Sequence, residues 1–223
     1  MSYKFKLNNK WYGEKEDSGF HALLYRRINV VLEPGVTILV GCNGSGKTTF
    51  LDQLKGDLKR KRTPYLSYDN LRDGGSNAIS KAGFYGDFDF LAHQVQSSEG
   101  ENIDRNIGEF AGKIGNFVYN KLKPEDKTVF LLMDAIDSGL SIDNIQSVKK
   151  DLFEFIIQDT QKRGIELYII ACANSYEMAR EENCFDVYNA TYIKFGDYEE
   201  YRSFIIKSRQ IKNKRYGIKE DAK

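Results

Sequence analysis

Residues 36–49 read VTILVGCNGSGKTT, a short apolar run followed by a glycine-rich loop. The first five residues predict a strand buried on both faces of a parallel sheet. The next residues match the pattern G-x-x-x-x-G-K-[ST], and helical spacing of leucines follows. A strand, this loop and a helix in that order are the context in which the pattern binds the phosphates of a nucleotide. A chance match in a surface loop is the alternative interpretation.

The residue types in the loop explain this predicted chemistry. Glycines let successive backbone N–H groups face the phosphates, and the N-terminus of the helix adds partial positive charge. We expect Lys47 to reach the β- and γ-phosphates, Thr48 to offer its hydroxyl to Mg²⁺, and Thr49 to touch the α-phosphate. The predicted cofactors are ATP and Mg²⁺. The predicted nucleotide-binding residues in the loop are Asn43, Gly44, Ser45, Gly46, Lys47, Thr48 and Thr49.

A second candidate magnesium ligand is Asp134. It ends the apolar run VFLLM at residues 129–133, which predicts another buried strand. A carboxylate at the end of such a strand can hold the hydration shell of Mg²⁺. An ordinary aspartate at a strand end is the alternative.

Apolar strand patterns alternate with helical patterns along the chain. This predicts an α/β fold of the P-loop NTPase kind, with a mainly parallel sheet, helices on both faces and an antiparallel N-terminal β portion. We expect a single domain over residues 1–223, with a core at about 25–195 and a C-terminal helix and charged tail at 197–223. Strands are expected within 28–40, at 65–68, 129–133 and 167–171, and as edge strands in 185–195; helices are expected at 50–59, 102–122, 145–161 and 197–212.

Composition narrows the class of protein. The formal net charge is +1, so overall charge does not indicate a polyanionic partner. The three cysteines are far apart, which favours a reducing compartment and argues against a zinc site. The sequence has no apolar run of about 18 residues and its first residues lack the apolar centre of a signal peptide. We therefore expect a cytoplasmic protein with no membrane partner.

Residues 41–49 resemble the phosphate loop of ATP-binding cassette (ABC) ATPases, with Asn before the second glycine. Ser138-Gly-Leu-Ser141 resembles the loop that these ATPases place at their dimer interface, and Ser97-Ser-Glu-Gly-Glu101 resembles a divergent form of their signature motif. The order of the motifs matches the family over about residues 25–176.

The resemblance implies a mechanism in which two heads pack head to tail around two ATP molecules. Ser98 and Gly100 would then meet the γ-phosphate bound by the other copy, so a homodimer is expected on ATP binding. A helix start, with Ser98 and Glu101 forming a capping box, is the alternative interpretation of this segment.

Spacing distinguishes the subfamilies. Lys47 and Ser98 are separated by too short a segment for the helical subdomain of transporter ATPases or for the long coiled coil of SMC-like repair ATPases. The resemblance is therefore to a stand-alone SMC-like or RecF-like head of the kind found in bacteria and their phages. It implies DNA maintenance, DNA repair or phage–host conflict. The alternative function is a nucleotide-sensing regulator that clamps a partner protein without turnover.

Several positions depart from the family pattern. Ala135 occupies the place of the glutamate that activates the attacking water, and an alanine cannot do acid–base chemistry. Two explanations stay open: a natural alanine with ATP used as a dimer clamp, or an alanine substituted for glutamate to trap the bound state. Asn174 stands where the family has a histidine. Asp69 is the nearest match for a glutamine that contacts metal or water, with a turn residue that opens the next loop as the alternative. Asp137 is a candidate substitute base, with a capping or dimer-contact role as the alternative.

The sequence also offers candidates for adenine binding and for contact with further partners, each with an alternative. Candidate residues for stacking on adenine are Trp11, Tyr12, Phe20 and Tyr25, with core or surface roles as the alternative for each. Two basic segments, residues 59–62 and 207–219, lie near tyrosines and are candidates for gripping DNA. A solvated charged surface is the alternative for both.

Overall fold

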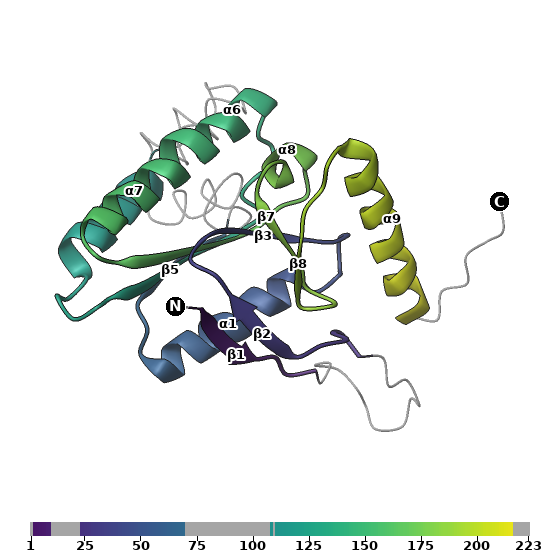
Figure 1. Cartoon of the computed structure of the whole chain (residues 1–223), viewed down its shortest axis with the longest axis horizontal. Helices are drawn as coiled ribbons and strands as arrows, with labels where there is room; N and C mark the ends of the chain where they lie inside the picture. The colour runs from purple at the N-terminus through teal and green to yellow at the C-terminus, as the bar shows by residue number, and fades with distance from the viewer. Residues whose placement is uncertain (1, 10–22, 70–107, 109, 216–223) are drawn as a thin grey trace, which may run out of the picture.

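The computed structural model describes residues 2–9, 23–69, 108 and 110–215. In these residues, six strands form one sheet in the order β4-β5-β6-β3-β7-β8, and β1 and β2 form a separate antiparallel pair (Figure 1). All neighbours in the larger sheet run parallel except β7 and β8. The strands are β1 Tyr3–Lys6, β2 Asn29–Leu32, β3 Gly35–Val40, β4 Tyr65–Asp69, β5 Thr128–Asp134, β6 Glu166–Cys172, β7 Asn183–Asp186 and β8 Thr191–Ile193.

Helices cover both faces of this sheet, as the sequence predicted. One face carries α6, η2 and α7, which follow one another without a break, and the other carries α1 together with the β1–β2 pair (Figure 1). No helix among the described residues has the length and apolar character that a membrane span requires. The helices are α1 Lys47–Lys61, the π-helical η1 Phe117–Lys121, α6 Ile142–Ser147, the π-helical η2 Val148–Glu154, α7 Phe155–Lys162, α8 Tyr176–Ala179 and α9 Tyr198–Arg215.

The central strands are apolar throughout because both of their faces are buried. In β5, Val129, Leu131 and Met133 pack on one face, and Phe130 and Leu132 pack on the other. Successive side chains of a strand point to opposite faces, so each face of the sheet receives its own core. Burying one such side chain completely contributes about 1.5–3 kcal/mol.

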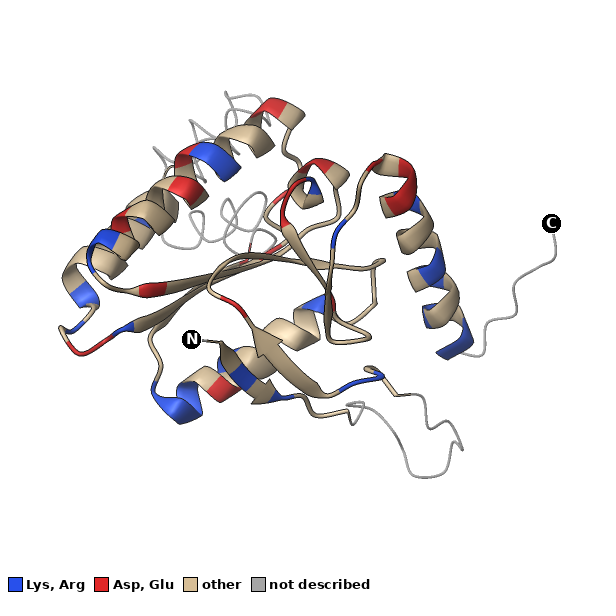
Figure 2. Cartoon of the chain, viewed as in Figure 1, with Lys and Arg blue, Asp and Glu red and all other residues tan. Residues whose placement is uncertain are grey.

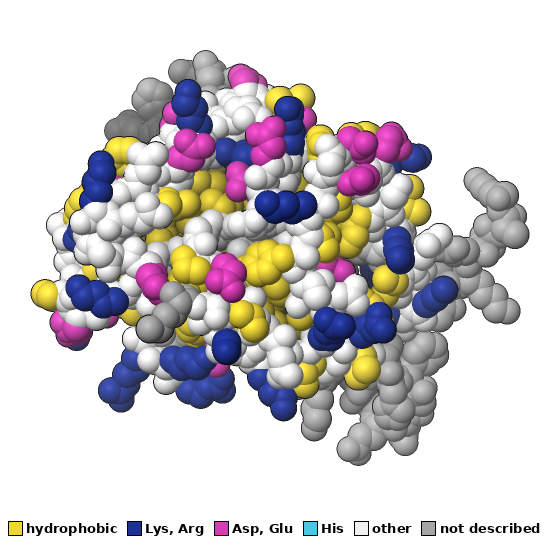
Figure 3. All heavy atoms as spheres, viewed as in Figure 1, with side chains coloured by type: hydrophobic (Ala, Val, Ile, Leu, Met, Phe, Trp, Pro, Cys, Tyr) yellow, Lys and Arg dark blue, Asp and Glu magenta, His cyan; other side chains and the backbone are white. Residues whose placement is uncertain are grey.

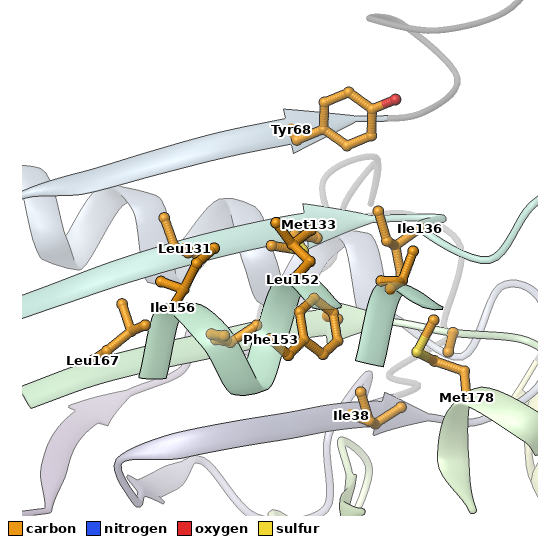
Figure 4. Packing of buried hydrophobic residues seen from close by; sticks show 14 of the residues in the cluster. Ile38, Tyr68, Leu131, Met133, Ile136, Leu152, Phe153, Ile156, Leu167 and Met178 are labelled. Atoms are coloured by element: carbon orange, nitrogen blue, oxygen red, sulfur yellow. The ribbon is translucent and has the colours of Figure 1, made fainter. Parts of the chain in front are cut away.

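Figure 4 shows the core on the face covered by α6, η2 and α7. Leu131 and Met133 of β5 lie against Leu152, Phe153 and Ile156 of the helical layer. These helical residues are separated by one, three and four positions, which places them on one side of the helix. The spacing of apolar residues in the sequence therefore explains both the helix and the face that it buries.

The expected strands are confirmed, with one correction. The strands expected in 185–195 were both predicted to lie at an edge, but β7 lies between β3 and β8, and only β8 is at the edge. β5 and β6 have seven residues each, and both extend slightly beyond the apolar runs at 129–133 and 167–171. The expected helix 145–161 begins earlier, at Ile142. Of the helix expected at 102–122, the structure describes helical backbone over residues 110–121.

The strand order determines where the loops meet. Because β3, β5 and β6 are parallel, their C-terminal ends lie at one edge of the sheet, with β6 between the other two. The residues that follow these strands are the glycine-rich loop, the segment after Asp134 and the segment after Cys172. Crevices at the C-terminal edge of a parallel sheet are common places for ligands.

Candidate functional site

The glycine-rich loop joins β3 to α1 along a backbone path that requires glycine. Gly41, Gly44 and Gly46 have φ angles of 145°, 79° and 107°, in the region that disfavours other residues. A Cβ atom at Gly41 would lie 2.6 Å from the Ser45 Oγ. A Cβ atom at Gly46 would lie 3.1 Å from Cδ1 of Leu24. These contacts and the positive φ angles make a larger residue unfavourable at either position.

The start of α1 presents backbone donors to the space outside the loop. Gly46 caps this 15-residue helix and has no side chain to accept a hydrogen bond from the first turn. The Phe50 N–H already donates to the Gly46 carbonyl at 2.8 Å, which begins the helical ladder. The preceding N–H groups of a helix lack such carbonyl partners and carry partial positive charge. This arrangement fits an anion such as a phosphate.

Lys47 lies inside the loop and is only 8% exposed. Its ammonium donates to the Gly41 carbonyl at 2.7 Å and to the Cys42 carbonyl at 3.4 Å. Burial lowers the pKa of Lys47, while the nearby carboxylates of Asp137 and Asp134 act in the opposite direction. A phosphate at the loop would supply the opposite charge that a desolvated ammonium lacks, so the site fits the predicted ligand.

Asp134 is the last residue of β5 and faces the same space. Its carboxylate lies near the thiol of Cys172, the last residue of β6. Burial raises the pKa of Cys172 well above its ordinary value, and Asp134 raises it further, so the thiol is neutral and can donate to the carboxylate. Asp69 ends β4 and pairs in register with Asp134 on the neighbouring strand.

The segments after β5 and β6 are tied together by Asp137. Its Oδ2 accepts hydrogen bonds from the backbone N–H groups of Asn174 and Ser175, at 2.8 and 2.6 Å. The carbonyl of Asn174 accepts a further hydrogen bond from the Tyr201 hydroxyl of α9, at 2.8 Å. These contacts support the capping role that was the alternative for Asp137, because its carboxylate is engaged in holding two loops together.

The loop and the two strand ends enclose one pocket of about 480 Å³. Most of the predicted site residues are brought together here: the lining residues are Leu24, Asn43, Gly44, Gly46, Lys47, Thr48, Thr49, Asp134, Ala135, Ser138, Cys172 and Asn174. Ser45 and Asp69 are not among these residues. Ser45 instead faces a second pocket, described below.

Two residues that line this pocket, Leu24 and Cys172, were not predicted from the sequence. Cys172 directly follows the apolar run 167–171, so its position at the strand end was a usable signal. Leu24 carries no such signal, because its place depends on how the segment before β2 packs on the loop. Tyr25, a candidate for adenine stacking, is fully buried, and its hydroxyl donates to the Gly46 carbonyl at 2.9 Å. It therefore supports the loop and does not present a ring for stacking.

Some predicted residues lie outside the described part of the chain. They are Ser98 and Gly100 with the rest of 97–101, and the stacking candidates Trp11, Tyr12 and Phe20. Of the basic segment 207–219, the structure describes residues 207–215, which belong to α9.

The basic run at residues 59–62 is partly engaged within the molecule. Asp57, one turn earlier in α1, forms ion pairs with both Arg60 and Lys61. The Lys61 ammonium also lies over the ring of Tyr3, 4.4 Å from its centre. Figure 2 shows the positive charge at this end of α1, where half of the run is already paired with a buried carboxylate. These pairs weaken the case for a DNA contact here.

No protein-family model matches this chain, and no curated protein matches it in sequence.

Proposed function

We propose that this chain is an ATP-binding protein of the ABC/SMC-like P-loop class, which takes ATP with Mg²⁺ at the pocket between the glycine-rich loop and the end of β5. The observation that carries the proposal is the convergence of Lys47, Thr48 and Asp134 on one pocket at the N-terminus of α1. Their residue types match the three tasks of phosphate binding, metal coordination and placement of the metal's water shell.

Each residue has a defined task in this proposal. The free N–H groups at the start of α1 donate to phosphate oxygens, and the Lys47 ammonium exchanges loop carbonyls for the β- and γ-phosphates. Thr48 and Asp134 would hold Mg²⁺, which neutralises charge on the phosphates when it is bound. Asn174 lines the pocket and can donate a hydrogen bond through its side chain, but it cannot carry charge.

Weak hydrolysis is part of the same proposal. Among the described residues that line the pocket, the one acidic side chain is that of Asp134, and Ala135 occupies the position next to it. Asp137, the candidate substitute base, is not among these lining residues, and its Oδ2 accepts hydrogen bonds from the backbone of residues 174–175. A slow ATPase that dimerises around ATP fits these observations, and so does the second candidate, a nucleotide-sensing clamp for a partner protein. Roles in DNA maintenance, repair or phage–host conflict rest on the family resemblance alone.

Substitution of Lys47 tests nucleotide binding. Lys47→Ala removes charge-assisted hydrogen bonds of the kind worth about 1.5–3 kcal/mol each, so the affinity for Mg-ATP should fall about 10- to 100-fold or more. Isothermal titration calorimetry with Mg-ATP measures it directly. Lys59→Ala, on an exposed position of the same helix, is the matched control and should bind as the parent does. Equal affinities for the parent and Lys47→Ala would reject this pocket as the ATP site.

A further inference from the structure

A second pocket, of about 390 Å³, adjoins the phosphate-binding loop at Ser45. Its walls come from the segment before β2, the β7–β8 hairpin and α9, and among the described residues it shares no lining residue with the first pocket. The C-terminal half of α9 lies near the entry to β2, since the Arg215 Nη2 donates to the Leu24 carbonyl at 2.9 Å (Figure 2).

The charge of this second pocket is strongly positive. In the part of the chain that the structure describes, four basic residues and one carboxylate, that of Asp186, line this pocket; the basic residues are Arg26, Arg27, Lys207 and Arg215. The Asp186 carboxylate already accepts hydrogen bonds within its own turn. They come from the Tyr188 backbone N–H at 2.9 Å and from the Asn189 side-chain amide at 2.6 Å. Figure 3 shows Lys and Arg side chains gathered below α9 on the viewed face. Such an excess of cations around a small cavity favours an anionic ligand.

Among the described residues, two buried donors in the pocket have no hydrogen-bond partner. The Ser45 side chain is 5% exposed with an unpartnered hydroxyl, and the Arg215 Nη1 is buried and unpartnered. The other nitrogen of that guanidinium is held by Leu24, and the group lies over the Tyr188 ring, 5.7 Å from its centre. Leaving a buried donor unpaired is unfavourable, and an oriented guanidinium suits the oxygens of a phosphate.

The same helix that forms one wall of this pocket also holds the phosphate-binding loop. The Ser208 hydroxyl, which lines the pocket, accepts a hydrogen bond from the Cys42 N–H at 3.1 Å. One turn later, the Lys212 ammonium donates to the Asn43 carbonyl at 3.1 Å. These contacts connect the wall of the second pocket directly to the loop of the first pocket.

We propose that this second pocket is a binding site for a small phosphorylated molecule, separate from the ATP pocket. Arg26, Arg27 and Lys207 attract the phosphate, and Ser45 and Arg215 supply the buried donors that receive it. The existence of the site does not depend on the proposed ATP binding. An effect of this site on nucleotide affinity does depend on the proposed ATP binding, because the effect would pass through the loop of the ATP pocket.

Pyrophosphate titrated into the Lys47→Ala chain tests the site, because this background disables the proposed ATP pocket. Calorimetry at low salt should detect binding by Lys47→Ala. Adding Arg26→Gln and Lys207→Gln should weaken that binding about 10- to 100-fold, as expected for the loss of charge-assisted contacts. The matched control adds Lys150→Gln and Lys162→Gln, two exposed lysines of the helical layer, and should bind as Lys47→Ala does. Circular dichroism confirms that all three chains are folded.

The outcomes separate the two proposals. Pyrophosphate binding by Lys47→Ala that depends on Arg26 and Lys207 supports the second site, even if the parent chain fails to bind Mg-ATP. No pyrophosphate binding by Lys47→Ala, or equal losses in the test and control chains, overturns it. Loss of binding to a single-stranded oligonucleotide, with pyrophosphate binding unchanged, also overturns it and assigns these cations to nucleic acid.

Discussion

Ala135 follows the last residue of β5, with a φ angle of 52°, and it lines the ATP pocket proposed above. Ala135→Glu adds a general base beside the proposed phosphate site, and such a group contributes about 10²- to 10⁴-fold to a rate. We expect ATP turnover to rise within that range, measured as phosphate release under saturating Mg-ATP.

Ala135→Gln is the matched control for that substitution. It has nearly the same shape as Glu but cannot accept the proton, so its turnover should stay at the level of the parent chain. If the Glu and Gln variants release phosphate at the same rate, Ala135 is not at the position of the water-activating group.

The last turns of α1 are joined to β1 by a cluster around Asp57. This carboxylate is 5% exposed and accepts hydrogen bonds from the Tyr3 hydroxyl at 2.8 Å and from the Arg60 and Lys61 side chains. Burial acts to raise the pKa of Asp57, but these hydrogen bonds and the Lys61 charge outweigh it and hold the pKa below the ordinary value. The ionised carboxylate therefore stabilises the folded state above the unfolded pKa of about 3.9, and this contribution is lost as the pH falls towards the lower folded pKa.

Asp57→Asn should lower the stability by about 1–3 kcal/mol at neutral pH, which corresponds to about 2–4 °C in melting temperature for each kcal/mol. The melting curves of the parent and the variant should converge as the pH falls below about 4. Asp52→Asn, at an exposed carboxylate of the same helix, should show a much smaller difference at all pH values. A difference in melting temperature between the parent and Asp57→Asn that stays constant down to the acid range would contradict an ionised Asp57 in the folded state.

Association of two copies is the proposed response of the whole molecule to ATP. The family resemblance implies that residues 97–101 of one copy meet the phosphates bound by the other. Size-exclusion chromatography with light scattering should therefore give the monomer mass without nucleotide and twice that mass with Mg-ATP. Slow hydrolysis at a site with Ala135 should keep the dimer together during the measurement.

Two variants sharpen this experiment. Lys47→Ala should stay monomeric with Mg-ATP, and Ala135→Glu should return to the monomer as phosphate is released. A parent chain that binds Mg-ATP yet stays monomeric would reject the head-to-tail model and favour the regulator that clamps a different protein.

The segment β3–loop–α1 could be predicted from the sequence because its signals are local. A five-residue apolar run, glycines at positions with positive φ angles, and leucines at helical spacing each determine their own part of the backbone. Asp134 was predicted in the same way, as a polar residue at the end of an apolar run, whereas Asn174 was identified from the family resemblance. Their convergence on one pocket further requires that β3, β5 and β6 be parallel and neighbours in the sheet.

Other features were decided by the tertiary structure. Three features depend on segments that are far apart in the chain. They are the place of β6 between β3 and β5, the hydrogen bonds from residues 174–175 to Asp137, and the contact of the buried Tyr25 with Gly46. The second pocket depends on α9 packing beside the β7–β8 hairpin and the segment before β2. The sequence by itself therefore determined the glycine-rich loop and the α/β pattern, because each rests on neighbouring residues. The strand order and the charged pocket beside Ser45 arise only when distant elements pack together, and no local periodicity encodes that packing.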